Sequence, residues 1–123
     1  MNGNGDIEVR DITNSFFGAG IIWGNVGDEF ELDLDMAGTV SYQFQDYLIR
    51  TGQDLTGPEY TDVNTNPNSD PDFDNPSTGN YRLTSSSTSA IDRSFILYGG
   101  ATDMDGEIQS GTSFDLGCYE YQQ

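Results

Sequence analysis

Apolar and polar residues alternate in several short stretches of the first fifty positions. Residues 7–10, 30–34 and 40–44 each place an apolar side chain at every second position. Successive side chains of a β-strand point to opposite faces of the sheet, so this period is typical of strands with one buried face. No window of the chain sustains the spacing of three and four residues that marks an amphipathic helix. The pattern predicts an all-β fold.

The residues between these stretches allow two arrangements of the strands. Residues 36–39 could form the turn of an antiparallel hairpin, which would lead to a small antiparallel β-sandwich. Alternatively, each stretch forms one side of a coil, and each strand pairs with the strand of the turn above it. The coil requires sharp corners where glycine or asparagine adopts a left-handed backbone, and Gly24 and Asn25 after Trp23 would supply one. The residue pattern alone does not separate the two arrangements.

All four prolines of the chain fall between positions 51 and 78, among many aspartates and asparagines. Proline lacks the N–H group that a central strand donates, so we expect this segment to be a loop. A loop of this length in a compact domain is typically functional or wraps a neighbouring structure. We therefore expect a single β domain over residues 1–123, with a strand-rich part at 1–50, a loop at 51–78 and a further part at 79–123.

Acidic residues far outnumber basic ones. The chain has 21 Asp and Glu, four Arg, and no Lys or His, for a formal net charge of −17. Such a surface repels phosphate groups, which excludes nucleic acid as a partner and disfavours anionic membranes. Strongly apolar runs such as residues 21–23 are far too short for membrane insertion. The charge favours solubility or, alternatively, an environment rich in divalent cations.

The sequence gives little support for nucleophilic catalysis. Cys118 is the single cysteine, and a nucleophilic cysteine normally needs a histidine partner, which the chain lacks. Because Cys118 lies between Gly117 and Tyr119 in a strand-like pattern, we expect it to be a small buried apolar residue. We predict no catalytic residue and no cofactor.

The best metal candidate is the stretch that contains Asp103, Asp105 and Gly106. Two carboxylates at this spacing before a glycine resemble the start of a calcium-binding loop, where alternate oxygens converge on the ion. The third ligand before the glycine and the later bidentate acid of such a loop are missing. Asp-Gly pairs also form ordinary turns. We predict a structural turn, with Ca²⁺ binding at Asp103 and Asp105 as the alternative.

Several short sequence motifs of the chain can be compared with a known family. They are Asn-Ser-Phe-Phe and Ile-Ile-Trp-Gly-Asn within 14–25, Asp-Pro-Asp-Phe-Asp-Asn-Pro at 70–76, Tyr-Arg-Leu at 81–83, Ser-Ala-Ile-Asp at 89–92, and Asp-Leu-Gly-Cys-Tyr-Glu-Tyr at 115–121. Together they resemble the C-terminal part of bacterial right-handed parallel β-helix proteins, the pectate-lyase-like superfamily that includes choice-of-anchor Q proteins. The chain departs from that pattern at residues 18–20, which read as a short insertion, at Arg93, where glycine is usual, and at Cys118, where alanine is usual.

The resemblance implies a fold and several local structures. It implies the end of a right-handed parallel β-helix, with coil rungs at 1–50, the loop at 51–78 and a terminal cap at 79–123. Residues 115–121 would be an edge strand over the open end of the coil. Arg82 and Asp92 would pair with each other or bind backbone groups in that cap. The opening residues 1–5 are typical of a start placed inside a longer chain.

The function implied is a non-catalytic, structural C-terminal region of an exported bacterial surface or polysaccharide-processing protein. Its partners would be the upstream rungs of its own chain and a polysaccharide, and its location would be extracellular or on the cell surface. One alternative is a carbohydrate-binding module in which Trp23 stacks on sugar rings. Another is part of a polysaccharide lyase or glycosidase in which Arg50 or Arg82 contacts the substrate.

Overall fold

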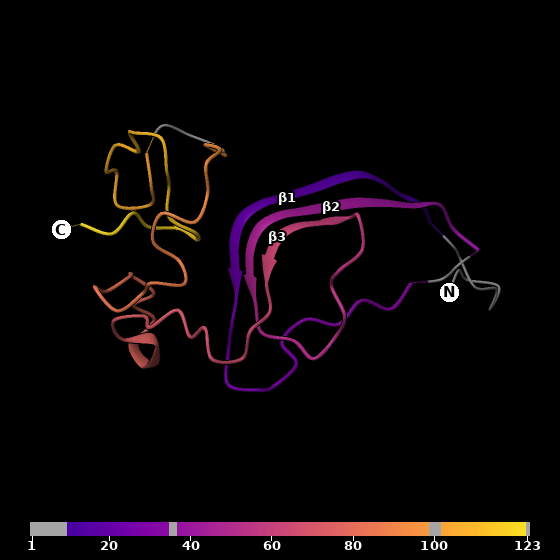
Figure 1. Cartoon of the computed structure of the whole chain (residues 1–123), viewed down its shortest axis with the longest axis horizontal. Helices are drawn as coiled ribbons and strands as arrows, with labels where there is room; N and C mark the ends of the chain where they lie inside the picture. The colour runs from indigo at the N-terminus through magenta and orange to yellow at the C-terminus, as the bar shows by residue number, and fades with distance from the viewer. Residues whose placement is uncertain (1–9, 35–36, 99–101, 123) are drawn as a thin grey trace, which may run out of the picture.

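The computed structural model describes residues 10–34, 37–98 and 102–122 and shows an all-β protein. Its strands are β1 (Ile12–Ile22), β2 (Val40–Ile49) and β3 (Tyr60–Asn64). They form one sheet in the order β1-β2-β3 (Figure 1). One turn of 3₁₀ helix, η1 (Pro76–Thr78), is the only helical element in this part of the chain. The predicted all-β fold is confirmed.

Both strand pairs are parallel. Phe17 lies opposite Phe44, and Phe44 lies opposite Tyr60. After β1 and after β2 the chain therefore returns through a loop to the starting end of the sheet, and Figure 1 shows these loops inside the bend of the strands. The antiparallel alternative is wrong for these strands, because a hairpin would have reversed the chain direction between neighbours.

Two sequence predictions about strand positions are wrong. Residues 30–34 alternate between half-buried and exposed but form no strand, because Phe30 packs from the loop against β2 instead of pairing through its backbone. The expected loop at 51–78 contains β3, whose five residues lie between Pro58 and Pro67 and include no proline. The predicted strand at 7–10 falls almost entirely outside the described residues.

All three strands bend, and the bend occurs at the same level in each (Figure 1). Ala19, Asp46 and Asp62 have φ values of 52°, 55° and 52°. The residues on either side of them are paired across the sheet, so the three left-handed residues lie side by side. Aspartate adopts this conformation more readily than most residues, whereas alanine does so at a cost of about 1–2 kcal/mol. The stacked left-handed residues form a continuous corner along the sheet.

The glycines on either side of Ala19 allow two aromatic rings to lie directly on the β1 backbone. A Cβ atom at Gly18 would lie 2.6 Å from the ring of Tyr98, and one at Gly20 would overlap the ring of Tyr47. Residues 18–20 are therefore the corner of β1. Sequence spacing hid this role because the two rings come from β2 and from a segment far along the chain.

An aromatic ladder runs along the inside of the bend. It consists of Phe17, Phe44 and Tyr60, one from each strand. The rings of Phe17 and Phe44 are stacked with centroids 4.5 Å apart, and those of Phe44 and Tyr60 lie 5.9 Å apart. Parallel, in-register pairing aligns these side chains at one level, so each ring covers the next. Phe17, at the edge of the sheet, remains 43% exposed.

The sheet has an apolar cluster on each face, and the neighbouring residues Leu48 and Ile49 point to opposite ones. Ile49 packs inside the bend with Phe44 and Leu55. Leu48 packs outside the bend, against residues of the C-terminal segment such as Leu116. This segment, residues 65–98 and 102–122, lies against the outer face of the sheet beyond the corner (Figure 1).

The C-terminal segment is held to the sheet by irregular contacts. The N–H group of Gly117 donates to the carbonyl oxygen of Ala19 in β1 at 3.0 Å, whereas that of Leu116 donates to the carbonyl oxygen of Ala90, within the segment itself, at 2.9 Å. The expected edge strand at 115–121 is wrong, because these residues form bends and lie against the outer face of β1 and β2. Gly117, with φ of 93°, breaks the extended geometry that a strand requires.

Replacing Gly20 with alanine tests the corner. We expect Gly20→Ala to lower the free energy of unfolding by about 1–3 kcal/mol, because the new methyl group overlaps the Tyr47 ring. Gly27→Ala is the matched control: nothing lies near its Cβ position, and its effect should stay within about 0.5 kcal/mol. Urea denaturation measures both variants, and equal stabilities would contradict the packing described for residues 18–20.

Candidate functional site

Asp103 holds a turn together through its two carboxylate oxygens. Oδ1 accepts hydrogen bonds from the N–H groups of Asp105 at 2.8 Å and Glu107 at 2.9 Å. Oδ2 accepts the N–H group of Glu120 at 2.9 Å. The side chain therefore closes the turn at 103–107 and ties it to the end of the C-terminal segment, which is the structural role predicted for this stretch.

Asp105 binds Arg82 instead of completing a metal site with Asp103. The Nε atom of Arg82 donates to Oδ2 of Asp105 at 2.7 Å, and Nη2 forms a second bond to Oδ1. The guanidinium also lies 4.8 Å from the ring centre of Tyr119. The hydrogen bonds from Arg82 lower the pKa of Asp105. Arg82 pairs with Asp105, so the predicted pairing of Arg82 with Asp92 is wrong.

The surroundings of Asp103 and Asp105 do not add further ligands. In the described part of the chain, no group of three or more His, Cys, Asp or Glu side chains is placed to hold a metal ion. Calcium binding at these two residues stays a prediction, and the observed bonds favour the turn.

Two more acidic side chains near the C-terminus serve as acceptors for backbone groups. Asp115 is 6% exposed and accepts the N–H groups of Asp92 at 2.8 Å and Tyr121 at 2.6 Å. Glu120 accepts the N–H group of Asp115 and the side-chain amide of Gln109. Burial raises the pKa of Glu120, and the nearby charges of Asp115 and Asp103 add to this. The residue pattern did not reveal that Asp115 and Glu120 accept hydrogen bonds from backbone groups, because it predicted an edge strand at 115–121.

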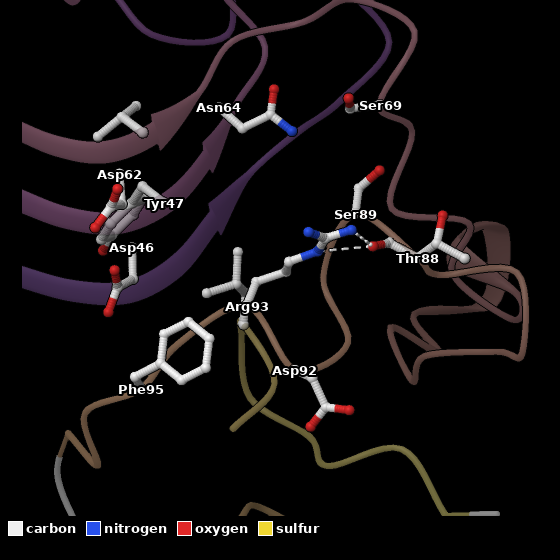
Figure 2. A pocket seen from close by; sticks show the side chains of 12 residues that line it. Asp46, Tyr47, Asp62, Asn64, Ser69, Thr88, Ser89, Asp92, Arg93 and Phe95 are labelled. Atoms are coloured by element: carbon white, nitrogen blue, oxygen red, sulfur yellow. Dashed lines mark hydrogen bonds between the residues drawn. The ribbon is translucent and has the colours of Figure 1, made fainter. Parts of the chain in front are cut away.

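A cavity of about 610 Å³ lies at the corner, between the sheet and the C-terminal segment. We call it the corner cavity. Figure 2 shows Asp46, Asp62 and Tyr47 on the strand side, with Arg93 and Phe95 facing them from the C-terminal segment. Phe95 is 77% exposed. Carboxylates and an arginine in one cavity invite comparison with the acid and base groups of a glycosidase or lyase.

The bonds inside the corner cavity favour a structural junction. Asp46 is 5% exposed and accepts the hydroxyl of Ser94 at 2.8 Å and that of Tyr98 at 3.4 Å. Arg93 donates from Nε and Nη2 to the carbonyl oxygen of Thr88, as the dashed lines in Figure 2 show. Arg93, which stands where the resemblance described above would place a glycine, thus stabilises the turn between residues 88 and 93. Two of the most reactive groups in the cavity are already bonded to the protein.

A second hollow, which we call the aromatic cleft, lies between the end of β1 and the C-terminal segment. It consists of two cavities of about 430 and 420 Å³ that share Trp23, Phe73 and Tyr81. The rings of Phe73 and Tyr81 are perpendicular, with centroids 5.4 Å apart. Asp70 and Asp72 line the second cavity. Sequence analysis named Trp23 as a candidate for sugar stacking, and the structure places it with other aromatic side chains.

The arginines considered for substrate binding flank this cleft. Arg50 donates from Nη1 to the carbonyl oxygen of Gly24 at 2.6 Å, and its guanidinium lies 5.6 Å from the ring centre of Trp23. Arg82, described above, lies over Tyr119, which lines the first cavity. Each arginine therefore already has a carbonyl or carboxylate partner and an aromatic ring. The indole Nε1 of Trp23 is buried without a hydrogen-bond partner among the described residues.

Cys118 also lines the aromatic cleft and is exposed, so the prediction that it is buried is wrong. The cause is Gly117, whose left-handed backbone interrupts the alternation expected of a strand. A Cβ atom at Gly117 would lie 3.2 Å from Ile21, so the chain passes close to β1 at this point. The side chain that follows is consequently directed into the cleft and not into the core.

Comparison with known proteins assigns no family to this arrangement. No family model matches the chain, and no curated protein and no solved structure matches it significantly. Within the described residues, no helix has the length and apolar character needed to cross a membrane. Conclusions about function therefore depend on the sequence and on the geometry given above.

Asp103→Ala tests the structural role of the turn. Three backbone N–H groups would lose a charged acceptor, and we expect the free energy of unfolding to fall by about 1–3 kcal/mol. Asp33→Ala, at an exposed position, should change it by less than about 0.5 kcal/mol. Chemical denaturation in the presence of a chelator measures both, and an unchanged Asp103→Ala variant would show that the turn does not need this side chain.

Glu120→Gln tests the effect of burial on the pKa of Glu120. A pKa raised in the folded state means that ionised Glu120 opposes folding, so this destabilisation grows as the pH rises above its usual pKa of 4.5. We expect Glu120→Gln to be more stable than the wild type at pH 7. The difference should shrink and vanish as the pH falls below about 4.5. Urea denaturation across this range measures it, and a difference independent of pH would contradict the assignment.

Proposed function

We propose that this chain is the terminal part of a longer right-handed parallel β-helix and has a structural, non-catalytic role in an exported bacterial surface or polysaccharide-processing protein. The observation that carries the proposal is the aromatic ladder of Phe17, Phe44 and Tyr60. Stacked, in-register side chains inside bent parallel strands are what a coil of repeated turns requires, because every turn places equivalent positions at the same level.

The stacked left-handed residues of the corner also support a coil, because every turn of a coil places equivalent positions at the same level. Ala19, Asp46 and Asp62 all adopt the left-handed conformation at one level of the sheet. A single bend can arise from local sequence, but a stack of bends needs each strand to repeat the geometry of its neighbour. The alanine in this stack has no side-chain preference for the conformation, which indicates that neighbouring strands and the rings over Gly18 and Gly20 impose it.

The two edges of the sheet differ, and this difference supports a terminal position. β1 is 11 residues long and exposes large apolar side chains, with Phe16 53% and Phe17 43% exposed. β3 has five residues, and its Thr61 and Asp62 are exposed. Short, polar edge strands discourage further pairing, whereas long apolar ones invite it. Further rungs would therefore add before β1 and not after β3.

The C-terminal segment then has a covering role. It buries Leu48 and part of β1 from the outside instead of crossing the end of the coil. The polar groups considered for catalysis, Arg50, Arg82 and Asp46, take part in contacts that hold this segment or its neighbouring loops. The non-catalytic part of the proposal is supported by these contacts, and an extracellular or cell-surface location by the sequence resemblance and the acidic surface.

Phe17→Asp tests the proposed edge. If β1 normally pairs with a preceding rung, the isolated chain should associate through this edge as its concentration rises, and Phe17→Asp should suppress the association. Phe95→Asp removes an equally large side chain that is 77% exposed and lies on the corner cavity, away from the edge, and it should leave the association unchanged. Sedimentation velocity measures all three proteins.

If the wild-type chain stays monomeric, hydrogen exchange tests whether the edge of β1 is unpaired. Backbone N–H groups of β1 should exchange faster than those of β2, because β2 is paired on both sides. Equal protection of β1 and β2 in the monomer would show that the chain closes its own edge, which would contradict the proposal. Turnover of a uronate polymer by the chain would overturn the non-catalytic part.

A further inference from the structure

We propose that the aromatic cleft binds an aliphatic ammonium cation. This inference does not depend on the β-helix proposal, because the cleft is built within the described chain. Its second cavity, of about 420 Å³, is lined by Trp23, Phe73 and Tyr81, with Asp70 and Asp72 on the same lining. Aromatic faces carry negative electrostatic potential and bind alkylammonium groups, and desolvation strengthens the attraction.

The arrangement of the rings favours a compact ligand. The rings of Phe73 and Tyr81 are perpendicular, at 87°, so they form two adjoining walls. Trp23 contributes to the same cavity. Two aromatic rings at right angles enclose a rounded group such as a methylated ammonium, whereas a sugar ring stacks on a single flat aromatic face. Tyr81 is 51% exposed, so one wall of the cavity is reached directly from solvent.

The charge around the cavity selects a cation. Asp70 uses one carboxylate oxygen to accept the N–H group of Asp72 at 2.8 Å, which fixes the loop. The carbonyl oxygen of Asp72 accepts the hydroxyls of Thr84 and Ser87, and Pro71 between the two aspartates is fully buried. Both carboxylates are thus carried on a preorganised loop. With a net charge of −17, the surface attracts cations and repels uronates and phosphates.

The protein already places cations on aromatic rings beside this site. Arg50 lies 5.6 Å from the ring centre of Trp23, and Arg82 lies 4.8 Å from that of Tyr119. The perpendicular rings of Phe73 and Tyr81 are the further aromatic walls shared by the two cavities. A ligand cation at these rings would repeat the interaction seen at the flanks of the cleft and would gain two carboxylates.

Titration with choline tests the inference, and Trp23, the single tryptophan of the chain, is the reporter. We expect a saturable change in Trp23 fluorescence with choline and a similar one with butylammonium. The alcohol 3,3-dimethylbutan-1-ol has the shape of choline without its charge and should bind at least about tenfold more weakly. Equal binding of the alcohol would show an apolar pocket without preference for charge and would overturn the inference.

Two variants locate the site, and a third is the control. Tyr81→Ala removes one wall and should weaken choline binding by about tenfold. Asp70→Asn keeps the oxygen that accepts the Asp72 N–H group but removes the charge, so it should weaken binding while the fold stays intact. Phe95→Ala, in the corner cavity, should bind choline like the wild type. Circular dichroism confirms that each variant is folded.

Three further outcomes would overturn the inference. They are the absence of any saturable change with choline or butylammonium, affinities unaffected by Tyr81→Ala and Asp70→Asn, and saturable binding of a neutral tetrasaccharide in place of the cations. Phe17→Asp should leave choline binding unchanged, because Phe17 belongs to the edge of the sheet and not to the lining of the cleft. A failure here would therefore be distinguishable from a failure of the β-helix proposal.

Discussion

The in-register stacking of the three parallel strands is the constraint on which the rest of the structure depends. It places Phe17, Phe44 and Tyr60 at one level and the left-handed residues of the corner at another. Both features must keep the same register, because a shift by one residue would move every ring to the opposite face. The glycines beside Ala19 and the outer packing of Leu48 are useful only in this register.

The acidic composition has a structural explanation in addition to solubility. The loops and the C-terminal segment contain few ladder bonds, so their N–H groups need other acceptors. Aspartate oxygens supply several of them: Asp70 closes a short Asx turn, and Asp103 and Asp115 accept N–H groups of more distant residues. Similar turns at Asn64 and Asn66 use neutral amide oxygens. Bonds to ionised acceptors are stronger than neutral ones. A small core is thereby supplemented by carboxylate–backbone bonds.

The sequence was informative where local pattern determines structure and less so elsewhere. Alternation at 40–44 correctly predicts part of β2, and the turn at 103–107 contains the Asp105-Gly106 pair on which it was predicted. The corner at 18–20 was missed because its glycines are explained by Tyr47 and Tyr98, which are distant in sequence. The exposure of Cys118 and the aromatic cleft likewise depend on how the C-terminal segment meets β1, which no local pattern encodes.

The bond from Gly117 to Ala19 links residues separated by most of the chain. During synthesis, β1 and β2 therefore emerge long before the segment that covers Leu48 and its neighbours. Contacts between such distant residues form slowly, and apolar surface that stays uncovered meanwhile promotes aggregation. A nascent chain that has released only β1 and β2 thus carries a partly finished sheet whose outer apolar face is still exposed to water.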